Sequence, residues 1–430
     1  MKVLMFGWEF PPHIAGGLGT ACEGIVKGLA HNGVETLFVM PSASGDEDQS
    51  CATILNASDV AVNHVSDTVE EFLNKVKFIN VDSSIVPYVD PEEYFEAIEK
   101  MKREQTKETT VGFGQKFKFS GKYGANLLEE VSRYAQVGGT IAMQHAGEFD
   151  VIHAHDWLTY LAGIAAKELS GKPLVVHVHA TSFDRGTDDM VDSRVYSIEK
   201  RGMEAADRVV TVSDLTRNIV INKYGIDPAK VVTVHNAVDF SGRENLQVDR
   251  GVRDKVVTFL GRITFQKGPE YFIEAAAKVL KRTKNVRFVM AGSGDMMNRA
   301  IRQVARLGIS DRFHFTGFLR GQEVQKMFAL SDVYIMPSVS EPFGISPLEA
   351  MRSNVPSIIS HQSGAAEVLK YALKVDFWDV DAMADDIYAL LQYPALSDFA
   401  NRQGFDEVNA LKWNNATLKL KKVYESVVNS

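Results

Sequence analysis

Short apolar runs, each followed by a Gly, Asp or Ser loop and then by a helical stretch, recur along the chain. This rhythm is typical of βαβ units on a parallel sheet that is buried on both faces. In the first half of the chain the pattern predicts strands near 2–7, 34–40, 149–154, 173–179, 208–213 and 231–235. In the second half it predicts strands near 255–261, 286–291, 312–316, 332–337, 356–360 and 374–377. Two sets of alternating units predict an α/β protein with two doubly wound, Rossmann-like domains.

A polar stretch with little apolar periodicity, residues 240–254, separates the two sets and is interpreted as a linker. We therefore predict an N-terminal domain over 1–245 and a C-terminal domain over 246–411. The last stretch, 412–430, is amphipathic and is expected to form a helix that packs on either domain, including back on the first. Residues from about 55 to 145 break the rhythm, and they are interpreted as an insertion facing the cleft or as a surface elaboration.

The composition narrows the class of protein. The 430 residues carry a net charge of −8, which gives no broad electrostatic footprint for nucleic acid or for an anionic membrane. Two cysteines, Cys22 and Cys51, make neither a disulfide scaffold nor a metal site, and they fit a reduced, cytoplasmic location. No apolar run reaches the length of about 18 residues that a spanning helix needs, so no transmembrane segment is expected. Peripheral membrane contact and the oligomeric state stay open.

Glycines follow two of the predicted strands. Gly16 and Gly17 precede a helix expected from about Thr20 to Asn32, where backbone N–H groups and the positive end of the helix dipole favour a phosphate. The alternative is a tight strand-to-helix turn. Gly292 begins a second, Gly-x-Gly turn, but a methionine stands where a dinucleotide fingerprint needs its third glycine. We interpret this turn as lining a nucleotide cleft.

Two cations, Arg262 and Lys267, lie between a predicted strand and a predicted helix. This position places them at the carboxyl end of the second sheet, where such folds bind ligands. The planar fork of an arginine and the point charge of a lysine together suit a diphosphate. The alternative is a pair of solvated loop cations.

Two carboxylates, Glu341 and Glu349, lie across the turn from strand 332–337 to the next helix, with Glu349 expected one to two turns into that helix. They can face one cleft and accept hydrogen bonds from sugar hydroxyls. A glycosidase with an acid and a nucleophile is the rival interpretation, although glycosidases need no diphosphate cradle. The simpler alternative is one glutamate at a helix start and one in solvent.

Histidines gather near strand ends in the first domain. His153 and His155 share one strand face, as do His177 and His179, and Asp156 follows His155. A spacing of two on a strand can bind a metal, but carboxylate ligands are sparse here, so we expect no metal. His153 and His177 are interpreted as hydrogen-bonded core residues.

Together these features resemble family 4 glycosyltransferases of the GT-B superfamily and the related glycogen and starch synthases, over nearly the whole chain. The residues that carry the resemblance are Gly16-Gly17-Leu18, His153-Ala154-His155-Asp156-Trp157, His179-Ala180-Thr181, Asn236-Ala237-Val238-Asp239, Arg262 with Lys267, and Glu341 with Glu349. The resemblance implies two domains facing each other across a cleft. It also implies a retaining, metal-independent hexosyl transfer from a nucleotide diphosphate sugar, with no cofactor.

The resemblance also implies roles for individual residues. Arg262 and Lys267 match the clamp on the donor diphosphate, His179 matches the histidine near the reacting carbon, and Glu341 matches a catalytic contact to the transferred sugar. Donor-binding residues are expected at Gly16, Gly17, Asn236, Gly292, Phe343, Gly344, Ile345, Leu348 and Glu349, of which Glu349 matches the acceptor of the ribose hydroxyls. His155 and Asp156 are candidates for the acceptor side or the cleft.

The segments Gly7–Pro12 and His155–Trp157 look synthase-like, which favours glucose as the sugar and an α-glucan as the acceptor. Ile14 stands where many glycogen synthases carry a lysine, and this difference favours a broader family 4 identity. The alternatives are a transferase acting on a lipid, a cell-surface polysaccharide or a small molecule, a nucleotide-sugar epimerase, and a non-catalytic binding module. The donor base, the sugar, the acceptor and the linkage stay open.

Overall fold

The structure of the protein is a computed structural model that describes residues 1–13, 17–64, 66–67, 114–121, 126–186, 191–238, 248, 251 and 253–429. The chain folds into two compact units. Unit 1 comprises Met1–Phe183, Thr187–Ala237 and Trp413–Ser430, and unit 2 comprises Asp184–Gly186 and Val238–Lys412. Most of the expected linker, 240–254, lies outside the described residues.

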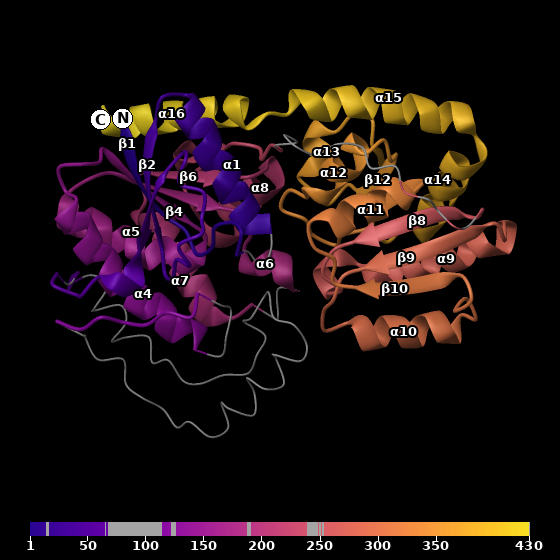
Figure 1. Cartoon of the computed structure of the whole chain (residues 1–430), viewed down its shortest axis with the longest axis horizontal. Coiled ribbons are helices and arrows are strands. Elements are labelled where there is room, and N and C mark those ends of the chain that lie inside the picture. Colours follow the sequence, from indigo (N-terminus) through magenta and orange to yellow (C-terminus); the bar gives the residue numbers. More distant parts are fainter. Residues whose placement is uncertain are drawn as a thin grey trace, which may run out of the picture. The chain divides into compact units, whose positions relative to one another are not determined.

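Unit 1 is built on a seven-stranded parallel sheet with the order β3-β2-β1-β4-β5-β6-β7 (Figure 1). Its strands are β1 (Lys2–Phe6), β2 (Glu35–Met40), β3 (Thr53–Asn56), β4 (Val151–His155), β5 (Leu174–Val178), β6 (Arg208–Thr211) and β7 (Val231–Thr233). Six of them were predicted. The pattern missed β3 because this edge strand is only partly buried and mixes polar with apolar residues.

Both faces of this sheet are covered by helices. Among the described residues, the helices of unit 1 are α1 (Gly17–His31), α4 (Leu127–Gln144), α5 (Trp157–Ser170), α6 (Ser182–Arg185, whose last two residues are assigned to unit 2), α7 (Ser193–Ala205), α8 (Asp214–Tyr224) and α16 (Trp413–Val428). One core lies between the sheet and α4, α5 and α7, and a second lies between the sheet and α1 and α16. The strands are therefore buried on both sides, as their nearly continuous apolar runs require.

The last helix, α16, packs against α1 (Figure 1). Two glycines of α1 allow this close approach: a Cβ at Gly24 would lie 2.1 Å from Nε1 of Trp413, and one at Gly28 would lie 2.6 Å from Oγ1 of Thr417. The side-chain amide of Asn32 also donates to that hydroxyl, at 2.9 Å. The two ends of the chain are therefore neighbours in unit 1.

The expected insertion, about 55–145, does not extend to residue 145. The helix α4 belongs to the core of unit 1, where it packs along α5. The paired glycines of α4 let the helices approach, since a Cβ at Gly138 would lie 2.8 Å from the Cβ of Ala162. Two adjacent glycines and several polar residues weakened the helical signal in the sequence. Residues 68–113 lie outside the described residues.

Unit 2 is built on a six-stranded parallel sheet with the order β10-β9-β8-β11-β12-β13. Its strands are β8 (Lys255–Leu260), β9 (Val286–Ala291), β10 (Phe313–Gly317), β11 (Val333–Met336), β12 (Ser357–Ser360) and β13 (Leu373–Val375). Its other helices are α9 (Pro269–Arg282), α10 (Met297–Arg306), α11 (Gln322–Leu330), α12 (Ser346–Arg352), α13 (Ala365–Val368), α14 (Val380–Gln392) and α15 (Pro394–Ala410). All six strands were predicted, and with unit 1 they confirm the α/β class with two Rossmann-like halves.

Within the described residues, none of the helices is both long enough and apolar enough to cross a membrane.

Candidate functional site

The predicted cations of unit 2 lie in the loop after the central strand β8. This loop contains a short 3₁₀ turn, Phe265–Lys267, that ends at Gly268 with φ 62°. A Cβ at Gly268 would lie 2.2 Å from the carbonyl oxygen of Pro337, so only glycine fits where the β8 loop meets the β11 loop. Because β8 and β11 are parallel neighbours, their carboxyl ends bring these two loops together.

Lys267 and Glu341 form an ion pair across the two loops. The Lys267 side chain is 18% exposed and the Glu341 side chain is 8% exposed, so water screens this pair little. The Ser338 hydroxyl also donates to the Glu341 carboxylate, at 3.5 Å. The alternative that Lys267 is a solvated loop cation is therefore wrong.

Arg262 is held by a buried glutamine that the sequence did not single out. One terminal nitrogen of the guanidinium, Nη2, donates to Oε1 of Gln266 at 2.9 Å. The backbone carbonyl of Gln266 in turn accepts from the N–H of Val339, at 2.9 Å. Gln266 therefore fixes both the direction of Arg262 and the position of the loop that carries Glu341.

The loop that carries Glu341 is fixed by backbone hydrogen bonds. The Glu341 N–H donates to the carbonyl of Gln362, and the Glu341 carbonyl accepts from the N–H of Gly364, both at 2.9 Å. Gly344 adopts φ 93°, and a Cβ there would lie 3.1 Å from Cγ of Glu341. A side chain at this position would therefore strain the backbone and press on the Glu341 side chain.

The other predicted residues of this turn lead into α12. Ile345 immediately precedes the helix, Phe343 is buried, and the Leu348 side chain is completely buried. Glu349 lies in the first helical turn, which is earlier than predicted, because α12 already begins at Ser346. There its negative charge is favoured by the helix dipole.

Glu341 and Glu349 lie near the same tyrosine. Burial raises the pKa of Tyr334, and the negative charges of Glu341 and Glu349 raise it further, against a hydrogen bond from Ser346 that lowers it. The Tyr334 ring is fully buried on β11. Both carboxylates therefore lie close enough to Tyr334 to act on its pKa.

At Gly292 the backbone of the β8 loop leaves no room for a side chain. Gly292 adopts φ 142°, and a Cβ there would lie 1.8 Å from the carbonyl oxygen of Gly261. The next glycine of the turn, Gly294, approaches the Ile263 carbonyl in the same way. Packing between the β8 and β9 loops therefore explains the Gly-x-Gly pattern without a ligand.

In unit 1, Gly17 is the first residue of α1, and Gly16 lies outside the described residues. The prediction of free backbone donors at this helix start is only partly correct. The Gly19 N–H donates to Oε1 of the buried Glu9 at 3.0 Å, so a carboxylate already occupies part of this anion site. The sequence carried no signal for this contact, which joins residues ten positions apart.

The loop after β5 is tied to the loop after β4. Nδ1 of His155 and Nε2 of His179 lie 2.9 Å apart, at hydrogen-bond distance. Oδ1 of Asp156 accepts from the backbone N–H groups of His179 and Ala180, at 2.7 and 3.3 Å. These contacts bring three predicted residues together and fix the direction of the His179 ring.

Asp156 has a strained backbone, with φ 58° and ψ 169°. This region of φ and ψ is essentially restricted to glycine and costs about 1–3 kcal/mol for another residue. Such strain persists where the surroundings over-determine a geometry, which is common at functional sites. We infer that the hydrogen bonds of the Asp156 carboxylate offset the conformational cost of its backbone.

The histidines of this face are uncharged. Burial lowers the pKa of His179 to about 3, and it lowers the pKa of His155 well below the ordinary value, with a smaller contribution from neighbouring histidines. A neutral imidazole has one N–H donor and one acceptor nitrogen. The pair can therefore direct a hydrogen bond without adding charge.

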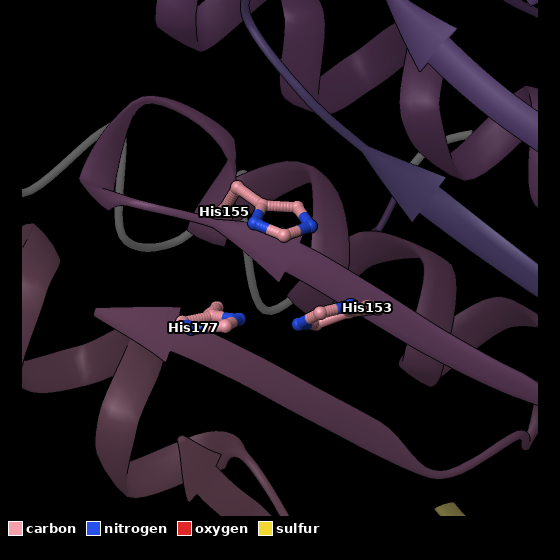
Figure 2. Close-up of side chains that lie close together, drawn as sticks. All are labelled: His153, His155 and His177. Atoms are coloured by element: carbon pink, nitrogen blue, oxygen red, sulfur yellow. The ribbon is translucent and has the colours of Figure 1, made fainter. Parts of the chain in front are cut away.

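The other two histidines of this face, His153 and His177, have buried ring nitrogens that lack hydrogen-bond partners among the described residues. Nδ1 of His153 lies 2.8 Å from the Tyr424 hydroxyl of α16, but Nε2 of His153 and both ring nitrogens of His177 have no hydrogen-bond partner among the described residues. The prediction that His177 is a hydrogen-bonded core residue is therefore wrong. With His155, these two rings form a group that could hold a metal ion (Figure 2).

The predicted site residues are thus divided between the two units. Unit 1 carries Gly17, His155, Asp156, His179 and the buried Asn236, whose Oδ1 has no partner among the described residues. Unit 2 carries Arg262, Lys267, Gly292, Glu341, Phe343, Gly344, Ile345, Leu348 and Glu349. In both units the groups follow the carboxyl ends of parallel strands, the usual place for ligands in such sheets.

Solved structures share this fold along the whole chain. Sucrose-phosphate synthase from Thermosynechococcus elongatus matches 99% of this chain and 98% of its own, with a TM-score of 0.70 and 16% identity. The catalytic domain of starch synthase IV from Arabidopsis thaliana, bound to ADP and acarbose, matches 100% of this chain and 99% of its own, with a TM-score of 0.66 and 15% identity. The fold of this chain is that of a GT-B glycosyltransferase, as the resemblance predicted.

The amino-acid sequence identifies the family. Residues 2–233 match the family described as "Starch synthase catalytic domain", and residues 243–404 match "Glycosyl transferases group 1". The chain belongs to the starch synthase catalytic domain family, and it is a glycosyltransferase of the glycogen and starch synthase type.

Individual relatives are distant. An uncharacterized glycosyltransferase of Methanocaldococcus jannaschii is 26% identical over 99% of this chain and 98% of its own length. Glycogen synthase of Mycobacterium tuberculosis is 22% identical over 99% of this chain and 94% of its own. D-inositol 3-phosphate glycosyltransferase of Kribbella flavida is 28% identical over 63% of this chain and 70% of its own.

Proposed function

We propose that this protein transfers a glucosyl group from a nucleotide diphosphate glucose to an α-glucan, with retention of the anomeric configuration and without a metal ion on the diphosphate. The observation that carries the proposal is the Lys267–Glu341 ion pair beside Arg262, at the carboxyl end of the unit 2 sheet. It combines cations for a diphosphate with a carboxylate for sugar hydroxyls.

In this proposal unit 2 holds the donor. The diphosphate lies against Arg262 and Lys267, which neutralise the charge that builds up as the glycosidic bond breaks. Glu341 then shares Lys267 with the diphosphate and accepts hydrogen bonds from the sugar. Glu349 accepts from the ribose hydroxyls. Gln266 and the hydrogen bonds of the 341–345 loop hold these groups in place before the donor arrives.

Unit 1 supplies uncharged hydrogen-bonding groups near the reacting carbon. His179 is neutral because burial lowers its pKa to about 3. A neutral ring contacts the sugar without repelling the positive charge that develops at the anomeric carbon. Asp156 and His155 act as positioning residues, since they fix the backbone and the ring of His179.

The reaction balances without a cofactor. The bond between the anomeric carbon and the phosphate oxygen breaks, and the electron pair leaves with the nucleoside diphosphate. An acceptor hydroxyl forms the new bond on the same face of the sugar. Its proton passes to the leaving phosphate oxygen. No protein group needs to be a strong base, which fits a site whose histidines are neutral.

Two comparisons favour an α-glucan acceptor. The family match over residues 2–233 is to a starch synthase catalytic domain, and the glycogen synthase relative is aligned over nearly the whole chain. A cytoplasmic location is part of this proposal, and the free thiols of Cys22 and Cys51 are compatible with it.

A second candidate is a small polar acceptor in place of a glucan. The relative that acts on D-inositol 3-phosphate, with 28% identity over 63% of this chain, favours it. This candidate keeps the donor chemistry of unit 2 and changes only the acceptor.

The test is a matrix of donors and acceptors with the full-length chain. Nucleotide sugars that differ in base and sugar are first screened by thermal stabilisation, because a bound donor raises the melting temperature by mass action. The donor that stabilises the chain is then supplied with a labelled sugar and with glycogen, maltooligosaccharides or inositol phosphate. The expected product is a longer glucan whose new linkage is α by NMR.

Each product supports a different function. Label in inositol phosphate alone supports the second candidate, and an isomerised donor supports an epimerase. A β linkage contradicts retention. Thermal stabilisation by a donor without transfer to any acceptor supports a binding module and contradicts the proposal.

A further inference from the structure

Three histidines meet on the face of the unit 1 sheet that α1 and α16 cover. His153 and His155 are two positions apart on β4, and His177 lies directly opposite His155 on the neighbouring strand β5. One ring nitrogen of each lies within 4.8 Å of the corresponding atoms of the other two. In Figure 2 the His153 and His177 rings lie between the two strands with nitrogen atoms turned toward each other, and the His155 ring is drawn on the other side of the β4 ribbon.

These rings present several buried nitrogen atoms without a partner. Nε2 of His153, Nε2 of His155 and both nitrogens of His177 make no hydrogen bond among the described residues, and all three side chains are at most 1% exposed. Leaving one such group unsatisfied destabilises the folded state, because its hydrogen bonds to water are lost without replacement. A ligand that takes one nitrogen from each of the three rings would satisfy three of these four atoms together.

The Nδ1 atoms of His153 and His155 already lie at hydrogen-bond distance from neighbouring side chains. Nδ1 of His153 lies 2.8 Å from the Tyr424 hydroxyl, and Nδ1 of His155 lies 2.9 Å from Nε2 of His179. If each Nδ1 carries the proton, each Nε2 presents its lone pair to the centre of the group. Metal-binding histidines use their second nitrogen in this way, because the outer hydrogen bond fixes the tautomer and the ring direction.

The chemistry of the group selects the class of metal. The trio consists of imidazoles alone, without a thiolate or carboxylate. Imidazole ligands suit zinc and its late transition-metal neighbours, and not magnesium or calcium, which need oxygen.

The size of the group also fits. The ligand nitrogens lie within 4.8 Å of one another, and a triangle with sides of that length would place each at most about 2.8 Å from its centre, against a zinc–nitrogen bond of about 2.0–2.1 Å. The rings would therefore move inward by less than about 1 Å to reach bonding distance. Such a movement is within the reach of small rotations of the side chains.

We propose that His153, His155 and His177 bind one zinc ion within unit 1, with a water molecule as the fourth ligand. The ion joins β4 to β5 and, through Tyr424, to α16. Its ligand His155 lies next to His179, and all three ligands belong to the buried core of unit 1. Its role is therefore structural, and the inference does not rest on the proposed transferase reaction.

The first experiment is a metal count that requires no activity. The full-length chain is purified with a tag that contains no histidine, dialysed briefly against EDTA, and analysed by mass spectrometry for metals. We expect about one zinc per chain for the wild type and below about 0.1 for His177→Leu. The control, His31→Gln, removes an exposed histidine at the end of α1 and should keep about one zinc.

The second experiment examines coordination. The chain is unfolded in chelator and refolded with Co²⁺, whose visible absorption reports a tetrahedral nitrogen-rich site. We expect these bands in the wild type and in His31→Gln, and not in His177→Leu. Should His177→Leu fail to fold, the wild-type metal count and the cobalt spectrum decide the question by themselves.

Three results would overturn the proposal. The first is a wild type with less than about 0.1 zinc per chain. The second is an equal zinc content in the wild type and in folded His177→Leu, which would mean an adventitious ion only. The third is a melting temperature of metal-free His177→Leu at or above that of the wild type, as expected where leucine replaces an unsatisfied polar ring in an empty core.

Discussion

The two units place their predicted site residues at equivalent ends of parallel sheets but differ in charge. In unit 2, Lys267 and Glu341 form a mostly buried ion pair. In unit 1, His155 and His179 lie 2.9 Å apart and are uncharged, because burial lowers their pKa values. A diphosphate requires fixed cations, whereas the reacting carbon of a sugar acquires positive charge and is served better by neutral groups. Unit 2 therefore recognises charge, and unit 1 offers neutral hydrogen-bonding groups. Variants in one unit at a time test this difference.

The largest effect is expected at the unit 2 cations. Arg262→Ala and Lys267→Ala should each lower kcat about 100-fold or more, or roughly 3 kcal/mol, because each removes a fixed charge that stabilises the leaving diphosphate. Steady-state rates measure this loss. The double variant should lose less than the product of the single losses, since both cations act on one group. Lys278→Ala is the matched control, because Lys278 pairs with an exposed aspartate and should leave the rate unchanged.

Variants of Lys267 also test how much its ion pair with Glu341 contributes to the stability of the folded chain. Lys267→Ala leaves the buried Glu341 carboxylate unpaired and should destabilise the chain by about 3–5 kcal/mol. Replacing both charges, in Lys267→Met with Glu341→Gln, should recover most of this stability without restoring activity. Near-normal kcat in both single cation variants would contradict the clamp.

The next effect is expected at Asp156 in unit 1. Asp156→Gly relieves the strained backbone but removes the acceptor for the His179 and Ala180 N–H groups. The two changes oppose each other in stability, so the melting temperature should change little. The rate should fall by about 10- to 100-fold because the His179 ring loses its position. Asp156→Asn keeps an oxygen acceptor and should therefore retain more activity than Asp156→Gly. Equal rates for the two variants would contradict the positioning role of Asp156.

A smaller effect is expected at Glu349. Glu349→Ala should raise the KM for the donor about tenfold and change kcat less, because a contact to the ribose binds the ground state and the transition state alike. Donor saturation curves separate the two constants. A loss of kcat with an unchanged KM would move Glu349 into the chemistry of the reaction.

No effect is expected from chelation. If Arg262 and Lys267 neutralise the diphosphate, activity should survive EDTA in the assay and should not rise on addition of Mg²⁺ or Mn²⁺. Abolition of turnover by EDTA at an unchanged melting temperature, with recovery by a divalent ion, would mean that a metal, and not the clamp, holds the diphosphate.

The amino-acid sequence by itself determined the α/β class, twelve of the thirteen strands found among the described residues, and the positions of Arg262, Lys267, Glu341 and Glu349 after strand ends. These features are local, because the apolar period and the glycines of a loop lie within a few residues of each other. The sequence also predicted the helix 413–428 from its apolar stripe, but not the surface against which it packs.

The tertiary structure alone decided which distant residues meet. Tyr424 reaches His153 across 271 positions, Lys267 pairs with Glu341 across 74, and α4 joins the core despite its two adjacent glycines. It also decided that the histidines are neutral, since burial sets their pKa values and burial depends on the whole unit. Periodicity specifies which side of an element faces inward, but the partner on that side is selected by packing between elements that are remote in the chain.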